Sequence, residues 1–203
     1  GWMSRWSAPG SVDSMVGTSS DAIVADLALK GVEVDHRTAW EAGIRNAATI
    51  PPRAVVGRKG QARALFRSFV SADVHEGMSW TLEAAINDHA LSRYATWLAE
   101  RAEDAEDAEL RERFHAHAEW LAGRATAYAA VFDPVTGFFR GRRADGSWRT
   151  RTAGFDPDVW GGDYVETDAW GMAFTAPQDG SGLAALHGGE SALADMLERF
   201  FAA

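Results

Sequence analysis

The chain has 203 residues and 46% of them are apolar, which favours one folded domain with a sizeable core over a disordered chain. Its formal net charge of −9 argues against nucleic acid and membranes as partners, because anionic surfaces require clustered Lys and Arg. The absence of cysteine excludes disulfides, thiolate nucleophiles and cysteine-bound zinc. Nine tryptophans are many for this length, and some of them are candidate platforms for stacking sugars.

The first half of the chain predicts helices with recognisable ends. Residues 18–31 carry Ser and Asp at the start, an apolar stripe and a final glycine, which is typical of a capped helix. A second helix is expected over residues 36–48, with Asp35 as its N-cap. Residues 51–74 form a long connection whose basic centre, GRKGQAR, is interpreted as a solvated face. The clearest apolar period, at i, i+3 and i+4, predicts a helix over residues 79–101.

The second half predicts another long helix over residues 110–132, after a charged turn near residues 102–109. Residues 137–150 read as a β-hairpin with its turn at Asp145-Gly146. A short helix is expected before Pro177, one or two helical turns within residues 179–189, and a last helix from about Ser191.

The chain is therefore expected to be a single mainly α domain, residues 1–203, with six helices and one small β-hairpin. If the helices alternate in direction, the first, third and fifth begin at the same end. The segments that lead into them, SVDSMVGTSSD, HEGMSW and WGGDYVETDAW, each combine glycine, an acid or hydroxyl, and an aromatic residue or Met. We interpret this end as the functional one, since helix N-termini there offer free N–H groups.

The stretch WGGDYVETDAW holds the most interesting carboxyl groups. Glu166 lies between Asp163 and Asp168 and is framed by aromatic residues, which could desolvate a carboxylate and make it a general acid. Structural alternatives remain open: Asp168 could cap a helix with Glu166 in its first turn. Weaker candidates are Asp13, Asp21, Glu76 and Glu83.

Other chemistries find little support. The six histidines include no H-E-x-x-H spacing, and His115 and His117 are two residues apart, so they do not share a helix face. No G-x-S-x-G elbow or phosphate-binding loop is present, which argues against a serine hydrolase and a nucleotide enzyme.

Several long motifs in order carry a family resemblance. They are RWSAPGSVDSMVGTSSDAIVADLALKGV, GRKGQ, HEGMSWTLEAAINDHALSRYA, FDPVTGFFRGRRADGSW and DVWGGDYVETDAWGMAFTAPQDGSGLAALHGG. Together they resemble glycoside hydrolase family 92, the calcium-dependent exo-acting α-mannosidases, over nearly the whole chain.

The resemblance implies an incomplete (α/α)6 toroid, the central part of a catalytic domain that follows an N-terminal β-sandwich domain. It implies hydrolysis of terminal α-mannosides with inversion, a mannose-containing oligosaccharide as substrate, and Ca²⁺ as cofactor with its main ligands outside this chain. The family motif Y-[TV]-E-x-N-x-W matches YVETDAW and assigns the general acid to Glu166. Glu76, Trp80, Trp160 and Asp168 are the residues we expect to line the sugar site. A secreted, periplasmic or cell-surface location fits the family better than the cytoplasm.

The family's general base and its G-N-E-P and W-D-T motifs have no counterpart here, so we expect a fragment of a longer chain that is inactive alone. Asp168 stands where the family usually has Asn, Gly171 where it often has Gln or Asn, and Gln178 where it often has His. These departures leave calcium affinity and linkage preference open. The alternatives are a non-catalytic glycan-binding or scaffold module, and another toroid glycosidase such as a trehalase-like enzyme.

Overall fold

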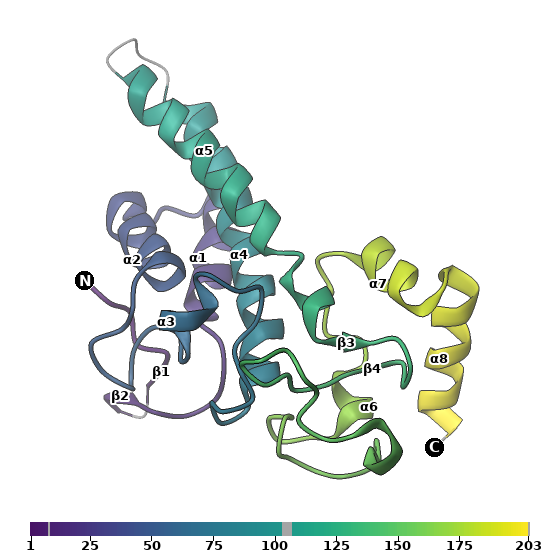
Figure 1. Cartoon of the computed structure of the whole chain (residues 1–203). Coiled ribbons are helices and arrows are strands. Elements are labelled where there is room, and N and C mark those ends of the chain that lie inside the picture. The colour runs from purple at the N-terminus through teal and green to yellow at the C-terminus, as the bar shows by residue number, and fades with distance from the viewer. Residues whose placement is uncertain (8, 103–106, 203) are drawn as a thin grey trace.

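The computed structural model describes residues 1–7, 9–102 and 107–202, and they form a mainly helical structure, as expected (Figure 1). The charged turn expected near residues 102–109 lies largely outside these ranges. Within them, no helix is both long and apolar enough to span a membrane.

The first two helices begin and end close to where the sequence predicts. Helix α1 is Ser20–Leu29, and Gly31 follows it with φ +77°, a conformation that suits glycine after a helix end. Helix α2 is His36–Ala48, and the Asp35 carboxylate accepts a hydrogen bond from Thr38 N at 3.0 Å, which confirms the predicted cap.

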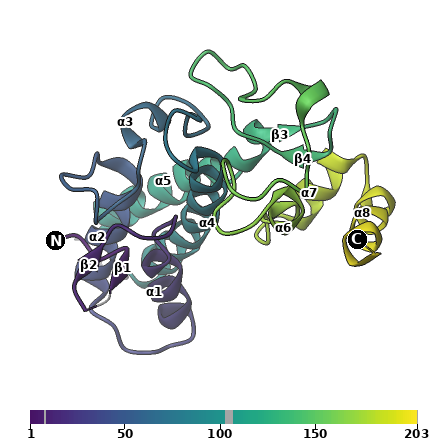
Figure 2. The same cartoon turned by 90° about the horizontal axis from the view of Figure 1, so that it is seen from below.

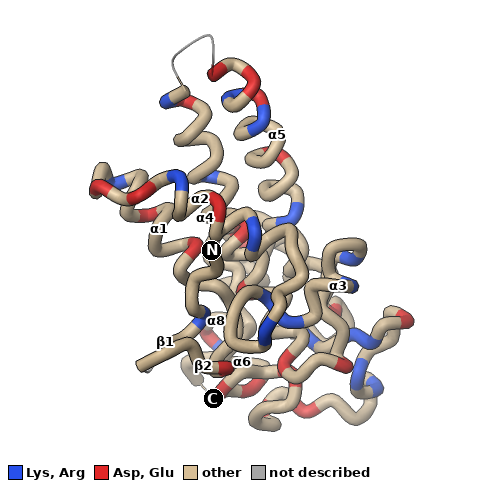
Figure 3. The backbone as a smooth tube through the Cα atoms, turned by 90° about the vertical axis from the view of Figure 1, so that its left-hand side faces the viewer, with Lys and Arg blue, Asp and Glu red and all other residues tan. Residues whose placement is uncertain are grey.

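Helix α4, Gly77–Arg101, is the central element of the fold. It buries 14 of its 25 residues and packs along α5, Ala108–Arg124, in a long antiparallel hairpin. Figure 1 shows this hairpin projecting from the body of the molecule, and Figure 3 shows acidic and basic residues interspersed along it. The N-terminal end of α4 therefore lies opposite the tip of the hairpin.

The chain departs from the expected pattern after Arg124. The predicted helix over residues 110–132 ends there, and a 3₁₀ helix, Ala127–Val131, leads into strand β3, Phe132–Asp133, which pairs antiparallel with β4, Phe138–Phe139. The turn at Asp145-Gly146 is present, but the pairing across it is a single bridge between Arg142 and Trp148. The regular hairpin thus lies one turn earlier than the sequence suggested.

Short elements that the sequence did not indicate complete the N-terminal half. Strands β1, Trp6–Ser7, and β2, Ser11–Val12, form a second small hairpin, and α3, Gln61–Ala64, interrupts the long connection. Elements this short have too few residues to show a period. In the second half of the chain, another 3₁₀ turn occupies Thr152–Gly154.

Three helices follow the β3–β4 hairpin. They are α6, Ala169–Met172; α7, Gly180–His187; and α8, Glu190–Ala202. Figure 2 shows α7 and α8 at the opposite side of the molecule from α1 and α2, with α4 between the two groups. The expected short helix before Pro177 and the last helix near Ser191 are both confirmed.

Helix α4 contributes to each of three apolar clusters. Trp40, Tyr94 and Leu121 belong to the cluster between α1, α2, α4 and α5. A second cluster joins α4 to the β3–β4 hairpin and the C-terminal helices through residues such as Leu82 and Phe139. The third cluster is small and lies at the N-terminal end of α4, where the candidate site is found.

Candidate active site

The three segments expected to meet at one end of the helices do meet there. Val16 from the first segment and Trp80 from the second form one apolar cluster with Val70, and the partly buried Val165 from the third segment packs against it. Gly17 also lies directly on α4, because a Cβ atom built on it would come within 2.9 Å of Glu83 Oε2. Sequence positions about 65 and 85 residues apart are thus brought to one place.

Ser79 joins the second segment to the third. It is fully buried, and its hydroxyl donates to the Asp163 carbonyl at 2.7 Å and accepts from Val165 N at 3.1 Å. Both partners flank Tyr164, whose hydroxyl donates to the Phe139 carbonyl at 2.8 Å. The loop that carries Glu166 is therefore fixed from α4 and from β4. Ser79 was not among the predicted site residues, and the only sequence signal for it was a hydroxyl at the start of a predicted helix.

The three acids of this loop have different surroundings. Asp163 accepts from Gly141 N at 2.8 Å and pairs with Arg149 at 3.0 Å, so it ties the loop to the neighbouring turn. Asp168 accepts from Gly171 N at 2.9 Å and caps α6, as the structural alternative foresaw. Glu166 is exposed, precedes the cap rather than lying in the helix, and makes no side-chain hydrogen bond or ion pair to the described residues.

Unusual backbone conformations gather in the same three segments. Among the described residues, Met15, Glu76 and Glu166 are the non-glycine residues with positive φ, at 57°, 56° and 50°. This conformation costs a residue with a side chain roughly 1–2 kcal/mol, and such strain tends to occur at functional sites. One strained residue in each of the three converging segments supports the interpretation that this end is the functional one.

The other expected sugar-site residues are placed differently from one another. Glu76 precedes α4 and its partly buried carboxylate lies 3.5 Å from His75 Nδ1. Trp160 is 69% exposed and so presents an open ring. Trp80 is only 2% exposed, and the Arg5 guanidinium covers its ring at 5.0 Å from the centroid. Trp80 is therefore a packing residue that holds the segments together, without an open face for stacking.

Glu83, a weaker candidate in the sequence, lies one turn beyond Trp80 on α4. Burial raises the pKa of its carboxyl. Asn87, one further turn along, accepts hydrogen bonds from Thr18 N at 2.8 Å and Thr18 Oγ1 at 3.1 Å. The first segment therefore contacts α4 at two points: Gly17 lies against Glu83, and Thr18 is hydrogen-bonded to Asn87.

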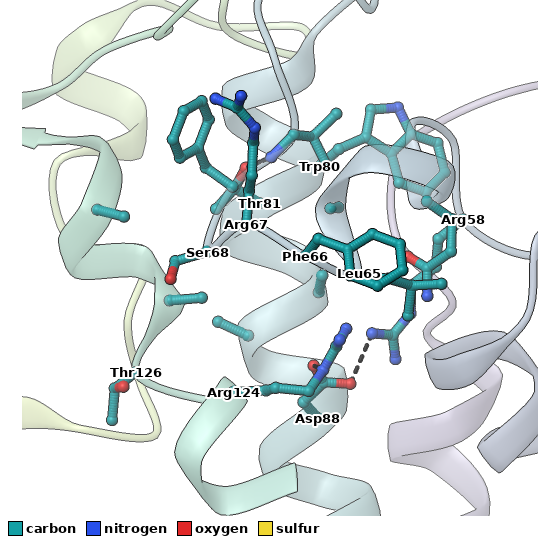
Figure 4. A pocket seen from close by; sticks show the side chains of 18 of the residues that line it. Arg58, Leu65, Phe66, Arg67, Ser68, Trp80, Thr81, Asp88, Arg124 and Thr126 are labelled. Carbon is teal, nitrogen blue, oxygen red and sulfur yellow. Dashed lines mark hydrogen bonds and ion pairs between the residues drawn. The ribbon is translucent and has the colours of Figure 1, made fainter. Parts of the chain in front are cut away.

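A pocket lies apart from Glu166, beside α4 and the 58–70 connection (Figure 4). Its volume is about 480 Å³, and its polar wall is a buried network in which Asp88 pairs with Arg58 at 2.6 Å and with Arg124 at 2.8 Å. Arg58 also pairs with Asp21 at 3.4 Å, so its charge is already neutralised. The interpretation of GRKGQAR as a solvated face was therefore wrong for Arg58, which is 2% exposed because two buried carboxylates pair with it. The network accounts for these groups as structural, and we do not place the reaction in this pocket.

The side chains of the described residues do not supply a complete set of ligands for a metal ion. Residues 1–7, 9–102 and 107–202 contain no group of three or more His, Asp or Glu side chains that could hold a metal ion. Asp163 and Asp168 are already used by the loop and the helix cap.

Comparisons with known proteins agree with this architecture. The structure matches that of the family GH92 inverting mannosidase BT2199 from Bacteroides thetaiotaomicron VPI-5482 with a TM-score of 0.84 and 28% identity, covering 97% of this chain and 25% of the mannosidase. It matches the family GH92 α-mannosidase BT3965 from Bacteroides thetaiotaomicron with a TM-score of 0.72 and 25% identity, covering 91% and 22% of the two chains. No curated protein sequence matches the chain significantly.

The chain thus spans about a quarter of the length of these solved enzymes, and the expected mainly α part of a toroid is confirmed. The model of the glycosyl hydrolase family 92 catalytic domain matches residues 1–203. The protein therefore belongs to glycosyl hydrolase family 92.

Proposed function

We propose that the protein is an exo-acting α-mannosidase that hydrolyses terminal α-mannosides of glycans with inversion, with Glu166 as its general acid. One observation carries the residue assignment: of the three acids in the loop, only Glu166 has a carboxyl that the described residues leave unengaged, on a strained backbone where three segments meet. The solved relatives named as mannosidases support the reaction class.

The reaction needs two carboxyl groups with different tasks. Glu166 donates its proton to the oxygen of the leaving group as the glycosidic bond breaks, and a base removes a proton from water that attacks the opposite face of the sugar. The two carboxyls of an inverting glycosidase stand about 6.5–9.5 Å apart. We place the base outside these 203 residues, so this segment supplies the acid half of the pair.

The sugar site is proposed to form around Glu166 from the residues that remain accessible. Trp160 offers an open ring for stacking, and Glu76 offers a carboxylate at the start of α4. Asp168 contributes by fixing the start of α6, and Trp80 by packing the three segments together. Positioning matters here, since misplacing a catalytic group by about 1 Å can cost on the order of 10²-fold in rate.

Calcium remains part of the proposal because the family resemblance implies it, and its chemistry would be to bind sugar oxygens as a hard cation. The described residues do not supply a complete ligand set, so its main ligands are proposed to come from elsewhere in the protein. The contribution of this segment is to hold and orient Glu166.

The natural partner of this segment is proposed to be the rest of its own catalytic domain, with a β-sandwich domain before it. Large apolar side chains support this view, since Phe66 is 89% exposed and Phe201 81% exposed in this segment.

A second candidate function is a glycan-binding or scaffold module without catalysis, which the incomplete metal ligand set favours.

The experiment uses the full open reading frame that contains these residues. We expect the enzyme to release mannose from α-mannosides, with β-mannose as the first product seen by NMR, and to lose activity when calcium is chelated. Replacing Glu166 with Gln is expected to cost on the order of 10²–10⁴-fold on a substrate with a poor leaving group. Binding of mannosides without any turnover would support the glycan-binding module and contradict the proposed enzyme.

A further inference from the structure

Thr167 follows Glu166 directly, and its side chain lies over Gly171. A Cβ atom built on Gly171 would overlap with Thr167 Oγ1 and would stand 3.0 Å from Thr167 Cβ and 3.2 Å from Cγ2. Rotating the Thr167 side chain cannot clear all three atoms, because its Cβ does not move. Thr167 thus occupies the space that a side chain at position 171 would enter, and any residue larger than glycine there requires Thr167 to rotate and shift.

The Thr167 hydroxyl is available for a ligand. The main chain of Thr167 is fixed, because its carbonyl accepts from Gly161 N at 2.8 Å. Within the described part of the chain its Oγ1 makes no hydrogen bond, although a hydroxyl can donate one and accept two. Glu166 and Gly171 are both exposed, so this hydroxyl lies near the surface beside the proposed acid.

We propose that Thr167 is a sugar-contacting residue whose hydroxyl hydrogen-bonds a hydroxyl group of the bound glycan next to the bond that Glu166 protonates. The Thr167–Gly171 pair then determines which polar group the protein offers at this point, a short hydroxyl from the loop in place of a longer side chain from α6. This inference rests on the proposed function of Glu166.

The first test compares Thr167→Val with Thr167→Ser in the full-length enzyme, using terminal α-mannosides as substrates. Val keeps the shape and removes the hydroxyl, so kcat/KM should fall about 2- to 10-fold, mainly through KM, as expected for one neutral hydrogen bond. Ser keeps the hydroxyl and should restore most of the loss. The thermal midpoint should change little in both variants, which separates a contact with substrate from a structural role.

The second test moves the hydroxyl from one residue to the other. Gly171→Ser alone should lower the thermal midpoint and kcat/KM, because its Cβ collides with Thr167. Thr167→Gly combined with Gly171→Ser removes the collision, returns a hydroxyl to the same region and should recover activity relative to either single variant. A Gly171→Ser variant with unchanged stability would overturn the steric pairing.

The outcomes for the two proposals can be told apart. If Thr167→Val matches the wild type in KM and kcat while Glu166→Gln is impaired, the sugar contact is wrong and the acid assignment stands. If the wild-type enzyme hydrolyses no α-mannoside, or Glu166→Gln is fully active, the proposed function fails and the contact fails with it.

Discussion

Replacing Ser79 with Ala should impair catalysis, although Ser79 is fully buried and does not need to contact the substrate. Its hydroxyl is the hydrogen-bonded link between α4 and the loop that carries Glu166, through Asp163 O and Val165 N. Removing it leaves the loop held from β4 by Tyr164, from the neighbouring turn by Asp163 and from its far end by the α6 cap, but no longer from α4 through this hydroxyl. The loop should then shift relative to the other two segments.

The magnitude follows from the two hydrogen bonds. Each is worth about 1 kcal/mol net, and the partly buried carbonyl and N–H left behind are poorly solvated, so the free energy of unfolding should fall by roughly 2 kcal/mol. A displacement of Glu166 by about 1 Å would lower kcat on the order of 10- to 100-fold. KM should change less, because most of the sugar site is unaltered.

The assay measures kcat, KM and the urea midpoint of the full-length enzyme, with Ser92→Ala as the matched control. Ser92 is also buried on α4, and its hydroxyl donates to the Ala118 carbonyl at 3.0 Å, away from the loop. The control should lose about 1 kcal/mol of stability and keep its kcat. A Ser79→Ala enzyme with the same kcat as the control would refute the link between this hydroxyl and the acid.

Two further predictions concern buried charges. Burial raises the pKa of Asp21 from 3.8 to about 6, so its contribution to stability is fully present below pH 4 and is lost as the pH rises toward 6 and above. At about 1.4 kcal/mol per unit of pKa shift, the free energy of unfolding should fall by on the order of 3 kcal/mol across this range. Hydrogen exchange of α1 between pH 4 and 7 should show this fall in the wild type and not in Asp21→Asn. Equal pH dependence in both proteins would contradict the pKa shift. Arg140→Met leaves Asp133 buried without its partner and should lower the free energy of unfolding by about 3–5 kcal/mol in urea titrations. A loss below about 1 kcal/mol, the range of an exposed pair, would show that the pair is solvated.

Features set by local sequence were the predictable part of this fold. The long helices α4 and α5 follow from apolar periods, and the cap at Asp35 follows from a single side chain and the backbone beside it. The meeting of three helix starts at one end could also be predicted, because helices that alternate in direction place every second N-terminus at the same end. Each of these is a property of neighbouring residues or of simple topology.

The remaining features depend on contacts between distant residues. The ring of Trp80, which was expected to line the sugar site, is covered by Arg5, a residue 75 positions earlier in the chain. The regular hairpin formed at β3 and β4 because Phe132 and Phe139 belong to the second apolar cluster, whereas the Asp145-Gly146 turn lies outside it. No local pattern could indicate that Ser79 would meet Val165.

The measurement that tests the central claim most directly is the leaving-group dependence of Glu166→Gln, with Asp158→Asn as a control. Asp158 is an exposed acid two residues before the stretch WGGDYVETDAW, and an amide oxygen there can still accept from Trp170 Nε1, which lies 3.0 Å away. A general acid is needed for a poor leaving group such as an alkyl alcohol and is dispensable for a dinitrophenolate.

We therefore predict that Glu166→Gln loses on the order of 10²–10⁴-fold in kcat/KM on an alkyl or disaccharide α-mannoside and far less on the dinitrophenyl α-mannoside. Asp158→Asn should match the wild type on both substrates. Equal losses on the two substrates, or full activity on the alkyl mannoside, would contradict the assignment of Glu166 as the general acid.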